Sequence, residues 1–497
     1  MAFDPTPEQL AAVAAAKTGE NLVITAGAGS GKTSTLKLIA DALAPRKGIY
    51  IAYNKAIATD AQKAFPKNVE CRTAHSFAYR AIGHAYQTRL KSTRVTGRQL
   101  ADLLGIDRSY PLPANRELAP QRVAGAIMAT INQWCRSADA KIMPRHVPEV
   151  PGTEDISYDF SVQIAEHAQR VWEEDLRHTT PTYSTEVFDR RTKRTSIVYV
   201  PFSHDMYVKL WALSNPKLQA DFILYDEAQD ADPCIAGIVL AQKSSQLIAV
   251  GDECQAIYGW RGATDAMKNW PAQQRVSLSK SFRFGPAVAE QANVFLEKLQ
   301  APLRIEGYEA KTSQVGMVDL IDADAVLCRT NAGVIATALS IHYARQVYIV
   351  GGSEPIRKFA EAAAQLMDGR RAPWHADLGA FDNWADVLDY VNNDAAGGDI
   401  RSMVNIIENF GVETIMEVCD KAASGKEPPK GALVLSTAHK AKGREWDRVV
   451  IHTDFIPQTD PETGETRQPS RMDLMLMYVA VTRAKTHLDC AALAWAA

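Results

Sequence analysis

The N-terminal part of the chain alternates between short apolar runs and longer stretches in which apolar and polar positions are mixed. NLVITA (21–26) and GIYIAYN (48–54) have the length and composition of buried strands. EQLAAVAAAK (8–17) and the stretch from Thr33 to about Leu43 are long enough for helices, and Pro45 ends the second of them. Strands and helices that alternate at this spacing predict a parallel, doubly wound sheet.

Stretches of the same strand character return in the rest of the chain. They are FILYDEAQD (222–230), QLIAVGDE (246–253), VDLIDADAVLCRTN (318–331), QVYIVGG (346–352) and ALVLSTAHKAKGREWDRVVI (432–451). A final helix is predicted through MYVAVTRAK (477–485). Two cycles of strands and helices therefore predict two α/β halves.

Two segments interrupt this alternation, because their patterns are mostly helical and contain no motif that we can name. Between the first of them and the next strand, residues 183–200 predict a β-hairpin whose tip, DRRTKR (189–194), is basic. The predicted domains are a first α/β domain at 1–82 and 183–280, a helical insertion at 83–182, a second α/β domain at 281–355 and 431–497, and a small second insertion at 356–430.

Composition and charge narrow the class of protein. A chain of 497 residues is too long for one hydrophobic core, and 46% hydrophobic residues are typical of globular domains. The net charge of −3 means that any nucleic acid has to bind in a local basic groove rather than through the charge of the whole molecule. Seven cysteines without a CxxC pair argue against a zinc ribbon and against a secreted disulfide scaffold.

The sequence shows neither the pattern of a secretory leader nor that of a membrane span. MAFDPTPEQL at the N-terminus lacks a charged region followed by an apolar stretch, and no run of about 18 apolar residues occurs. We therefore expect a soluble intracellular protein without a membrane partner, located in the cytoplasm or nucleoid, or in the nucleus if the source is eukaryotic.

A glycine-rich turn follows the first predicted strand and opens a helix. The turn, AGAGSGKT, consists of Ala26, Gly27, Ala28, Gly29, Ser30, Gly31, Lys32 and Thr33. Its glycines let backbone N–H groups converge on phosphate oxygens, Lys32 adds a positive charge, and Thr33 can ligate Mg²⁺. Ala26 stands where the usual pattern has Gly, but the strand–turn–helix context is the one that a nucleotide phosphate site requires.

A nucleotide site that hydrolyses its ligand also needs an acid for the metal and a group that orients water. FILYDEAQD supplies both, because a strand of buried character ends in Asp226, a predicted Mg²⁺ ligand, and Glu227, a predicted partner of the attacking water. The alternative is a solvated acidic turn, which an apolar strand beside a phosphate loop does not favour.

Six motifs follow one another in a fixed order, and together they resemble the UvrD/Rep/PcrA group of superfamily 1 helicases. They are AGAGSGKT, DEAQD, GDECQAIYGWRGA, SFR, TAHKAKGREWD and YVAVTRAK. Within that group, DEAQD and HDMYVKLWALSNP (204–216) are most similar to the helicase core of the F-box DNA helicases, without an F-box. The resemblance implies two RecA-like P-loop NTPase domains, each interrupted by a mainly helical insertion, that bind ATP and Mg²⁺ between them.

The resemblance also implies residues that hold the nucleoside. Gln9 would bind the adenine edge, Phe282 would stack on the adenine, and Glu445 would bind the ribose hydroxyls. Ser34 stands where the family often has an arginine on the other face of the adenine.

Three further residues match positions that contact the γ-phosphate in the family. Gln255 would sense this phosphate from the first half of the chain, and Arg283 and Arg483 would reach it from the second. Arginines in that role stabilise the charge of the transferred phosphoryl group and contribute roughly 10³–10⁵ in rate.

GDECQAIYGWRGA (251–263) places aromatic and basic residues directly after Gln255. Tyr258, Trp260 and Arg261 match positions with which the family contacts single-stranded DNA, and an indole is a stacking platform for any base. Trp260 could instead be a core residue, although the two glycines that flank it favour a loop. This stretch is therefore predicted to couple the phosphate site to DNA.

Other predicted DNA contacts follow from position in the family motifs. They are Tyr53 and Lys55 after the second strand, Thr73 and His75 in RTAHSF, and Thr437 and His439 in STAHKAKG. Hydroxyl and imidazole groups suit phosphate contacts, which position a strand without distinguishing its sequence. A structural role remains the alternative for each histidine.

The resemblance implies an ATP-driven DNA helicase or translocase that moves 3′→5′ on single-stranded DNA in repair, recombination or replication. Its partners would be single strands, single-strand/duplex junctions and proteins of recombination or replication. Two alternatives stay open: a translocase that displaces bound proteins but unwinds little, and a nucleotide-gated DNA-binding switch without turnover. The short second insertion favours limited unwinding, whereas Glu227, Arg283 and Arg483 argue against a switch.

Overall fold

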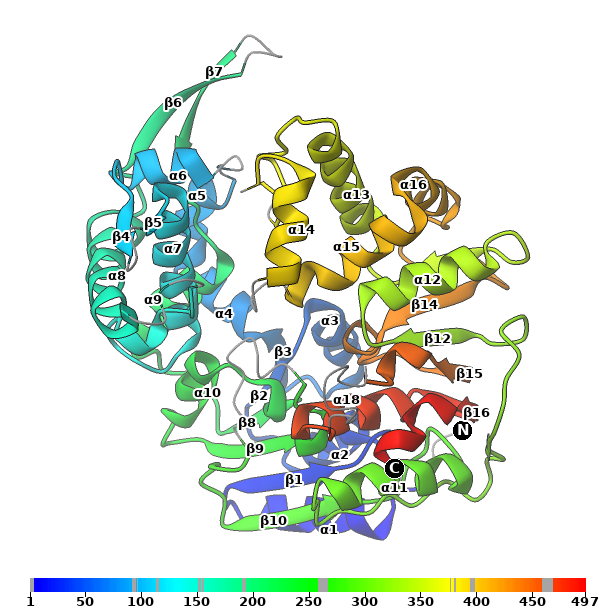
Figure 1. Ribbon diagram of the computed structural model, residues 1–497. Helices are drawn as coiled ribbons and strands as arrows, with labels where there is room; N and C mark the ends of the chain where they lie inside the picture. Colours follow the sequence, from blue (N-terminus) through cyan, green and yellow to red (C-terminus); the bar gives the residue numbers. More distant parts are fainter. Residues whose placement is uncertain are drawn as a thin grey trace. The chain divides into compact units, whose positions relative to one another are not determined.

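The computed structural model describes residues 4–91, 95, 97–112, 116–150, 153, 156–189, 194–257, 267–375, 377–379, 381–393, 398–457 and 468–497 (Figure 1). The chain divides into two compact units. The first comprises Met1–Thr25 and Lys32–Val276, and the second comprises Ala26–Gly31 and Ser277–Ala497.

The first sheet has six strands in the order β10-β1-β9-β8-β2-β3. Its strands are β1 (Leu22–Ala26), β2 (Gly48–Ala52), β3 (Val69–Thr73), β8 (Phe222–Tyr225), β9 (Gln246–Gly251) and β10 (Gln274–Leu278). The pairs β1–β9, β9–β8, β8–β2 and β2–β3 are parallel. Parallel strands end at the same edge of a sheet, so Asp226 after β8 and Asp252 after β9 follow strands that end at one edge.

Helices cover this sheet because parallel strands with two apolar faces need burial on both sides. They are α1 (Pro7–Lys17), α2 (Lys32–Ala42), α3 (Lys55–Ala64) and α10 (Pro233–Leu240). Thr6 and Gln9 form a capping box at the start of α1, and Asn54 caps α3 through its side chain. The core between sheet and helices includes Ile49, Ile223 and Leu247.

The helices between the strands of the first sheet build a second core within the same unit. They are α4 (Ala74–Ala81), α5 (Gln87–Leu90), α6 (Gly97–Leu103), α7 (Pro120–Arg136), α8 (Ser157–Val171) and α9 (His204–Leu213), with a small ribbon of β4 (Tyr110–Leu112) and β5 (Arg116–Leu118). Their core contains Trp134 and Trp172, whose rings meet edge to face with centroids 4.7 Å apart.

The predicted β-hairpin is confirmed. Strands β6 (Ser184–Asp189) and β7 (Arg194–Tyr199) pair in antiparallel register, with Ser184 opposite Tyr199 and Asp189 opposite Arg194. The hairpin projects beyond helices α5 to α8 of its own unit (Figure 1).

The second sheet also has six strands, in the order β11-β16-β15-β12-β14-β13. Its strands are β11 (Gln314–Val315), β12 (Ala325–Cys328), β13 (Val347–Ile349), β14 (Leu433–Thr437), β15 (Trp446–Ile451) and β16 (Ala484–Asp489). Every neighbouring pair is parallel. Two parallel sheets flanked by helices confirm the predicted fold class of two RecA-like domains.

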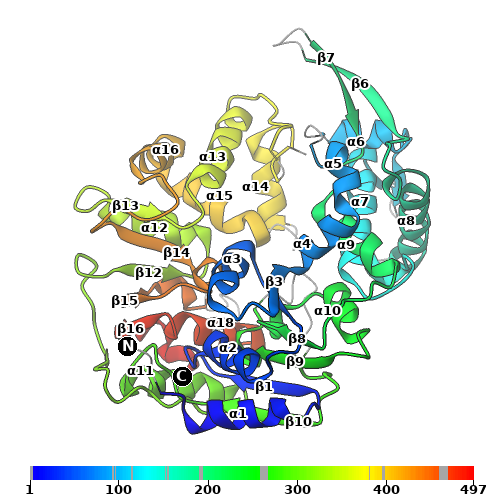
Figure 2. The same ribbon diagram turned by 180° about the vertical axis from the view of Figure 1, so that it is seen from behind.

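The helices of the second unit are α11 (Pro286–Lys298), α12 (Asn331–Ile341), α13 (Glu354–Met367), α14 (Trp384–Asn393), α15 (Gly398–Phe410), α16 (Val412–Lys421), α17 (Ala438–Ala441) and α18 (Arg471–Val481). Helices α13 to α16 gather beside the β13 side of the second sheet (Figure 2). Phe359 and Val404 of these helices share one core with Val326 and Leu433 of the sheet. The second insertion is therefore packed onto the sheet rather than built around a core of its own. The exact domain boundaries given above stay a prediction.

Two predicted elements differ from the structure. The strand predicted at 318–331 is only Ala325–Cys328, because Asp319 forms a turn with hydrogen bonds to the backbone N–H groups of Ile321 and Asp322. The helix predicted through 477–485 ends at Val481, and Ala484 already begins β16. Among the described residues, no helix combines the length and apolar character that crossing a membrane requires.

Candidate functional site

The glycine-rich turn follows β1 and leads directly into α2. Gly29 and Gly31 have φ angles of 73° and 79°, in the left-handed region that favours glycine. The hydroxyl of Ser30 donates to the carbonyl of Gly27 at 2.8 Å, and within the second unit the N–H of Phe282 donates to the carbonyl of Gly29 at 2.8 Å. These two hydrogen bonds fix the backbone of the turn. The turn also stands between a strand and a helix, as a phosphate site requires.

The first residue of α2 meets the second acid after β8. Nζ of Lys32 lies 3.7 Å from Oε1 of Glu227. Thr33 is adjacent to Lys32, and Asp226 is adjacent to Glu227, so the two predicted metal ligands belong to the segments that this ion pair brings together. A hydroxyl and a carboxylate are hard oxygen donors, and this donor set fits Mg²⁺.

Asp226 is buried, and its carboxylate is held by two donors. The hydroxyl of Tyr50 donates to Oδ2 at 2.5 Å, and the N–H of Glu227 donates to Oδ1 at 2.9 Å. Burial, followed by the charge of Glu227, raises the pKa of Asp226 to about 6, although the hydrogen bond from Tyr50 acts in the opposite direction. Two neighbouring carboxylates at a buried position fit a site that a divalent cation completes.

A buried glutamine connects this acid pair to the segment after β9. The side-chain amide of Gln229 donates to Oε2 of Glu227 at 2.6 Å and accepts from the N–H of Asp252 at 3.1 Å. Nε2 of Gln255 in turn donates to Oδ2 of Asp252 at 2.6 Å. The predicted phosphate sensor Gln255 is thus linked to Glu227 through Gln229 and Asp252.

Gln229 is missing from the residues that we selected from the sequence. It is fully buried, and the Cβ of any residue in place of Gly251 would lie 2.2 Å from its Oε1. The signal that could have identified Gln229 is its position in DEAQD, next to acidic residues. A buried amide at such a position needs hydrogen-bond partners for both its oxygen and its nitrogen.

Gln9 lies at the start of α1 and is buried. Its Oε1 accepts from the N–H of Thr6 at 3.0 Å, and its Nε2 donates to the hydroxyl of Thr35 at 3.1 Å. Each atom can make one more hydrogen bond, so the amide is compatible with an adenine edge. Ser34 is exposed in the first turn of α2, and both assignments stay predictions.

Arg283 and Glu445, predicted to bind different parts of the nucleotide, form an ion pair in the second unit. Nε of Arg283 lies 2.6 Å from Oε2 of Glu445, and the guanidinium also donates to the carbonyl of Thr482 at 3.0 Å. Phe282 lies next to Tyr308, with ring centroids 5.8 Å apart. The structure therefore brings three of the predicted nucleotide residues close together.

Arg483 is almost completely buried at 1% exposure. Its guanidinium donates to the carbonyls of Val479 and Arg444 at 2.8 and 3.3 Å, and to the hydroxyl of Thr482 at 2.9 Å. These bonds hold the side chain against the end of α18. The contact of Arg483 with the γ-phosphate stays a prediction.

The predicted DNA contacts of the first unit lie around the ends of β2 and β3. Tyr53 is exposed after β2, and Lys55 is exposed at the start of α3. The hydroxyl of Thr73 caps α4 by accepting from the N–H of Ser76 at 3.1 Å, and its own proton can still be donated to a phosphate. His75, in the same turn, lies with Nε2 3.1 Å from Oδ1 of Asp205.

The second T-x-H turn repeats this geometry in the second unit. Thr437 ends β14 and caps α17 by accepting from the N–H of Lys440 at 3.4 Å, and His439 is half-buried in the same turn. Tyr258, Trp260 and Arg261 lie outside the described residues, so their predicted contacts with DNA stay predictions.

Two cavities in the first unit are lined by residues that were predicted to act in catalysis or in DNA binding. A cavity of about 320 Å³ is lined by Asp226 and Glu227 of the acid pair and also by Tyr53 and His75. A larger cavity of about 790 Å³ is lined by Lys55, Thr73 and His75 among others. His75 borders both, so a continuous lining connects the predicted catalytic acids to the predicted DNA contacts.

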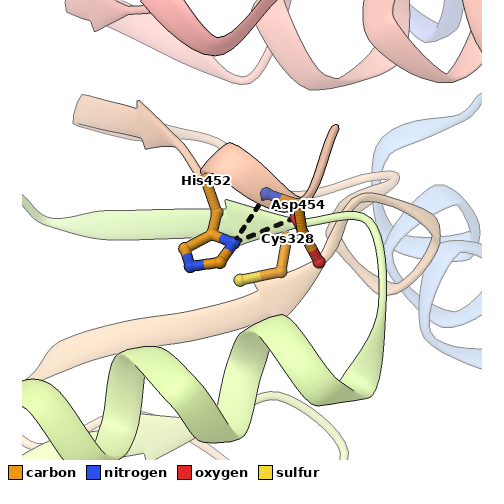
Figure 3. A group of neighbouring side chains, drawn as sticks. All are labelled: Cys328, His452 and Asp454. Carbon is orange, nitrogen blue, oxygen red and sulfur yellow. Dashed lines mark hydrogen bonds and ion pairs between the residues drawn. The ribbon is translucent and has the colours of Figure 1, made fainter. Parts of the chain in front are cut away.

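Cys328, His452 and Asp454 form a group in the second unit whose ligand atoms lie within 4.8 Å of one another (Figure 3). The carboxylate of Asp454 already accepts from the N–H groups of Arg329 and Thr330, each at 2.9 Å. His452 accepts from the N–H of Asp454 at 3.0 Å. Because these bonds tie the end of β15 to the start of α12, we assign the group a structural role.

Two family models match this chain. The model of the UvrD/REP helicase N-terminal domain matches residues 5–269, and that of the UvrD-like helicase C-terminal domain matches residues 432–488. The chain belongs to the UvrD/REP helicase family. This membership confirms the resemblance inferred from the six motifs.

Named proteins with similar sequences include two F-box DNA helicases. F-box DNA helicase protein 1 of Schizosaccharomyces pombe is 30% identical over 505 residues, which are 95% of this chain and 55% of that protein. F-box DNA helicase 1 of Gallus gallus is 29% identical over 507 residues, which are 94% of this chain and 47% of that protein. ATP-dependent DNA helicase UvrD2 of Mycobacterium tuberculosis is 24% identical over 330 residues. The chain spans about half the length of these relatives.

Proposed function

We propose that this chain is an ATP-dependent DNA helicase or translocase that moves on single-stranded DNA, with Mg²⁺ as the cofactor of hydrolysis. Membership of the UvrD/REP family and two relatives named as DNA helicases support the class of activity. Movement 3′→5′ and a role in repair, recombination or replication are the finer parts of the proposal, since they rest on the motif resemblance.

The observation that carries the proposal is the shared cavity in the first unit. Asp226 and Glu227, which suit metal binding and water orientation, line the same cavity as Tyr53 and His75, which suit contact with a nucleic-acid strand. A shift of either group on ligand binding would change the walls of the other site. The arrangement therefore supports a DNA-stimulated ATPase rather than an independent nucleotide site.

The roles of the chain's own residues follow from their chemistry. The turn with Gly29 and Gly31 would hold the phosphates through backbone N–H groups. Lys32 would give up its ion pair with Glu227 and form one with a phosphate instead. Glu227 would then be free to orient a water, while Thr33 and Asp226 would hold Mg²⁺, which neutralises charge on the phosphates. Arg283 and Arg483 would stabilise the transferred phosphoryl group.

Phosphate release measured with and without oligothymidine tests the proposal. We expect a basal rate that rises with DNA in the wild type, and loss of both rates in Lys32→Ala. Lys37→Ala is the matched control, because Lys37 lies on the same helix and forms a partly exposed ion pair with Asp41. A wild-type rate that does not respond to DNA would contradict the proposal, and turnover in Lys32→Ala would remove the site assignment.

Strand polarity and unwinding need a separate experiment. Fork substrates with a single-stranded tail at either the 3′ or the 5′ end report direction, and displacement of a bound protein from the same strands reports translocation alone. The proposal of 3′→5′ unwinding requires activity on the 3′-tailed fork. Displacement without unwinding would favour the alternative of a translocase, and DNA binding without phosphate release would favour a switch.

Location and partners complete the proposal. We place the protein inside the cell, in the cytoplasm or nucleoid or in the nucleus, where single strands, junctions and proteins of recombination or replication are the partners. The seven cysteines support this placement, because all are buried free thiols, as a reducing compartment permits.

A further inference from the structure

Asp205 connects three helices of the first unit through one carboxylate. Its Oδ1 lies 3.1 Å from Nε2 of His75 on α4, and its Oδ2 accepts from Nε of Arg136 at 2.9 Å. Asp205 itself lies in the first turn of α9, and Arg136 is the last residue of α7. A side chain in the T-x-H turn after β3 is therefore held by α9, and through Asp205 it is connected to the end of α7 in the insertion.

The carboxylate of Asp205 is charged at neutral pH. Burial would raise its pKa, but hydrogen bonds from His75 and Arg136 outweigh burial and lower the pKa to about 2. Hydrogen bonds to an ionised acceptor are about twice as strong as neutral ones, so the imidazole of His75 has a strongly preferred orientation.

This orientation decides which nitrogen of His75 can contact a ligand. Because Asp205 engages Nε2, Nδ1 is the nitrogen that remains for a phosphate, and in the charged ring Nδ1–H can donate while Nε2–H stays on Asp205. His75 borders the cavity that contains Glu227 and also the larger cavity that contains Lys55 and Arg72. Asp205 lines only the first of them.

We propose that Asp205, together with Arg136, is a positioning residue for DNA: it fixes the imidazole of His75 so that Nδ1 faces a phosphate of the bound strand. The proposal rests on the DNA-binding function proposed above. The positioning role also explains the contact between the insertion and the T-x-H turn. Arg136 at the end of α7 and Asp205 at the start of α9 set the direction of His75, a side chain that contacts DNA.

The same unit contains a matched control. Asp139 also accepts from a histidine and an arginine, with Oδ2 2.7 Å from Nε2 of His146 and Oδ1 2.6 Å from Arg145. This second group borders neither of the two cavities. Asp139→Asn therefore removes the same charge from the same type of group, at a residue that lines neither cavity.

The experiment measures affinity for a fluorescent oligothymidine at pH 7 in a double-mutant cycle. The proteins are the wild type, Asp205→Asn, His75→Ala, the double variant and Asp139→Asn, each checked for folding by its melting temperature. We expect Asp205→Asn to bind about 10-fold more weakly, the double variant to bind no more weakly than His75→Ala alone, and Asp139→Asn to bind as the wild type does. Asp205→Glu should restore most of the affinity.

A second measurement separates positioning from loss of structure. The oligothymidine concentration that half-saturates ATP hydrolysis should rise in Asp205→Asn, and the rate at saturating DNA should change much less. Additive effects of the two substitutions, or equal losses in Asp205→Asn and Asp139→Asn, would overturn the proposal. A wild type that does not bind oligothymidine would contradict the proposed function itself, which is a distinct result.

Discussion

At the scale of single residues, Arg283 and Glu445 pair with each other although they were assigned to the γ-phosphate and the ribose. The two assignments are compatible with this pair, because it uses only Nε of the guanidinium and Oε2 of the carboxylate, and each group has further hydrogen-bonding atoms for a phosphate or a ribose hydroxyl. The role of Arg283 as a finger therefore stays a prediction, and the ion pair with Glu445 is compatible with it.

Replacement of Arg283 tests this interpretation. We expect Arg283→Ala to hydrolyse ATP at least about 100-fold more slowly at saturating ATP, with little change in KM, because a finger acts on the transition state. Arg448→Ala is the control, since Arg448 pairs with Asp324 on the same sheet and has no predicted role at the nucleotide. An increase in KM at an unchanged maximal rate would make Arg283 a binding contact instead.

Acid should remove the stability that Asp205 contributes. Its folded pKa of about 2 lies below the ordinary value of 3.8, so the contribution is complete above about pH 4 and is lost as the pH falls toward 2. A shift of nearly two units corresponds to roughly 2 kcal/mol. Urea unfolding of the wild type and Asp205→Asn should differ by about this amount at pH 6, and the difference should shrink at pH 3. A difference that does not depend on pH would contradict this account.

At the scale of elements, the sites are built where strands end and helices begin. Thr73 and Thr437 each follow a parallel strand and cap a helix, and the phosphate turn joins β1 to α2 in the same way. A helix N-terminus offers N–H groups that no carbonyl of the helix satisfies, so it suits phosphates of ATP or DNA. One type of junction would thus serve both proposed ligands.

Gly29 tests how closely the phosphate turn is packed. In Gly29→Ala the new Cβ would lie 2.6 Å from Cβ of Arg283 and 2.7 Å from Oγ of Ser281, and φ is positive. Gly19→Ala is the control, because φ is also positive there but nothing lies within 4 Å. Both variants should lose about 1–2 kcal/mol of stability, and only Gly29→Ala should lose most of its affinity for ATP in a calorimetric titration. Equal ATP affinity in the two variants would show that the turn tolerates displacement.

Element prediction succeeded where apolar runs were continuous and failed where polar residues alternated with apolar ones. The buried runs of β1, β2, β8 and β9 were predicted within two residues at each end, except for the polar extensions after β8 and β9. VECRT of β3 and AKTHLD of β16 were not predicted, since more than half of their positions are polar. These strands are held by pairing with neighbours that are distant in sequence, which a local pattern does not contain.

The candidate site was predictable to the same extent. Lys32, Asp226 and Glu227 stand in motifs whose local sequence was sufficient to predict their chemical roles. Lys32 and Glu227, which belong to two of these motifs, form an ion pair in the structure. The partnership of His75 and Asp205 was not predictable, because 130 residues separate them and only the packing of α4 against α9 brings them together. Gln229 was overlooked for a related reason, since its second partner, Asp252, follows a different strand.

At the scale of the whole molecule, the chain combines two RecA-like sheets with membership of the UvrD/REP family, and the proposed function requires its nucleotide and DNA sites to communicate. The predicted coupling loop with Trp260 lies outside the described residues. A second connection is present within the first unit, where Gln229 links Glu227 to Gln255 through Asp252, and one cavity joins Glu227 to His75. We expect binding at one site to change affinity at the other, by the same factor in both directions.

The most direct test of this coupling is the affinity for oligothymidine measured with and without a non-hydrolysable ATP analogue and Mg²⁺, together with the reciprocal affinity for the analogue with and without DNA. The account predicts that each ligand changes the dissociation constant of the other by at least about 5-fold, with equal factors in the two titrations. Dissociation constants that stay the same in the presence of the other ligand would contradict it.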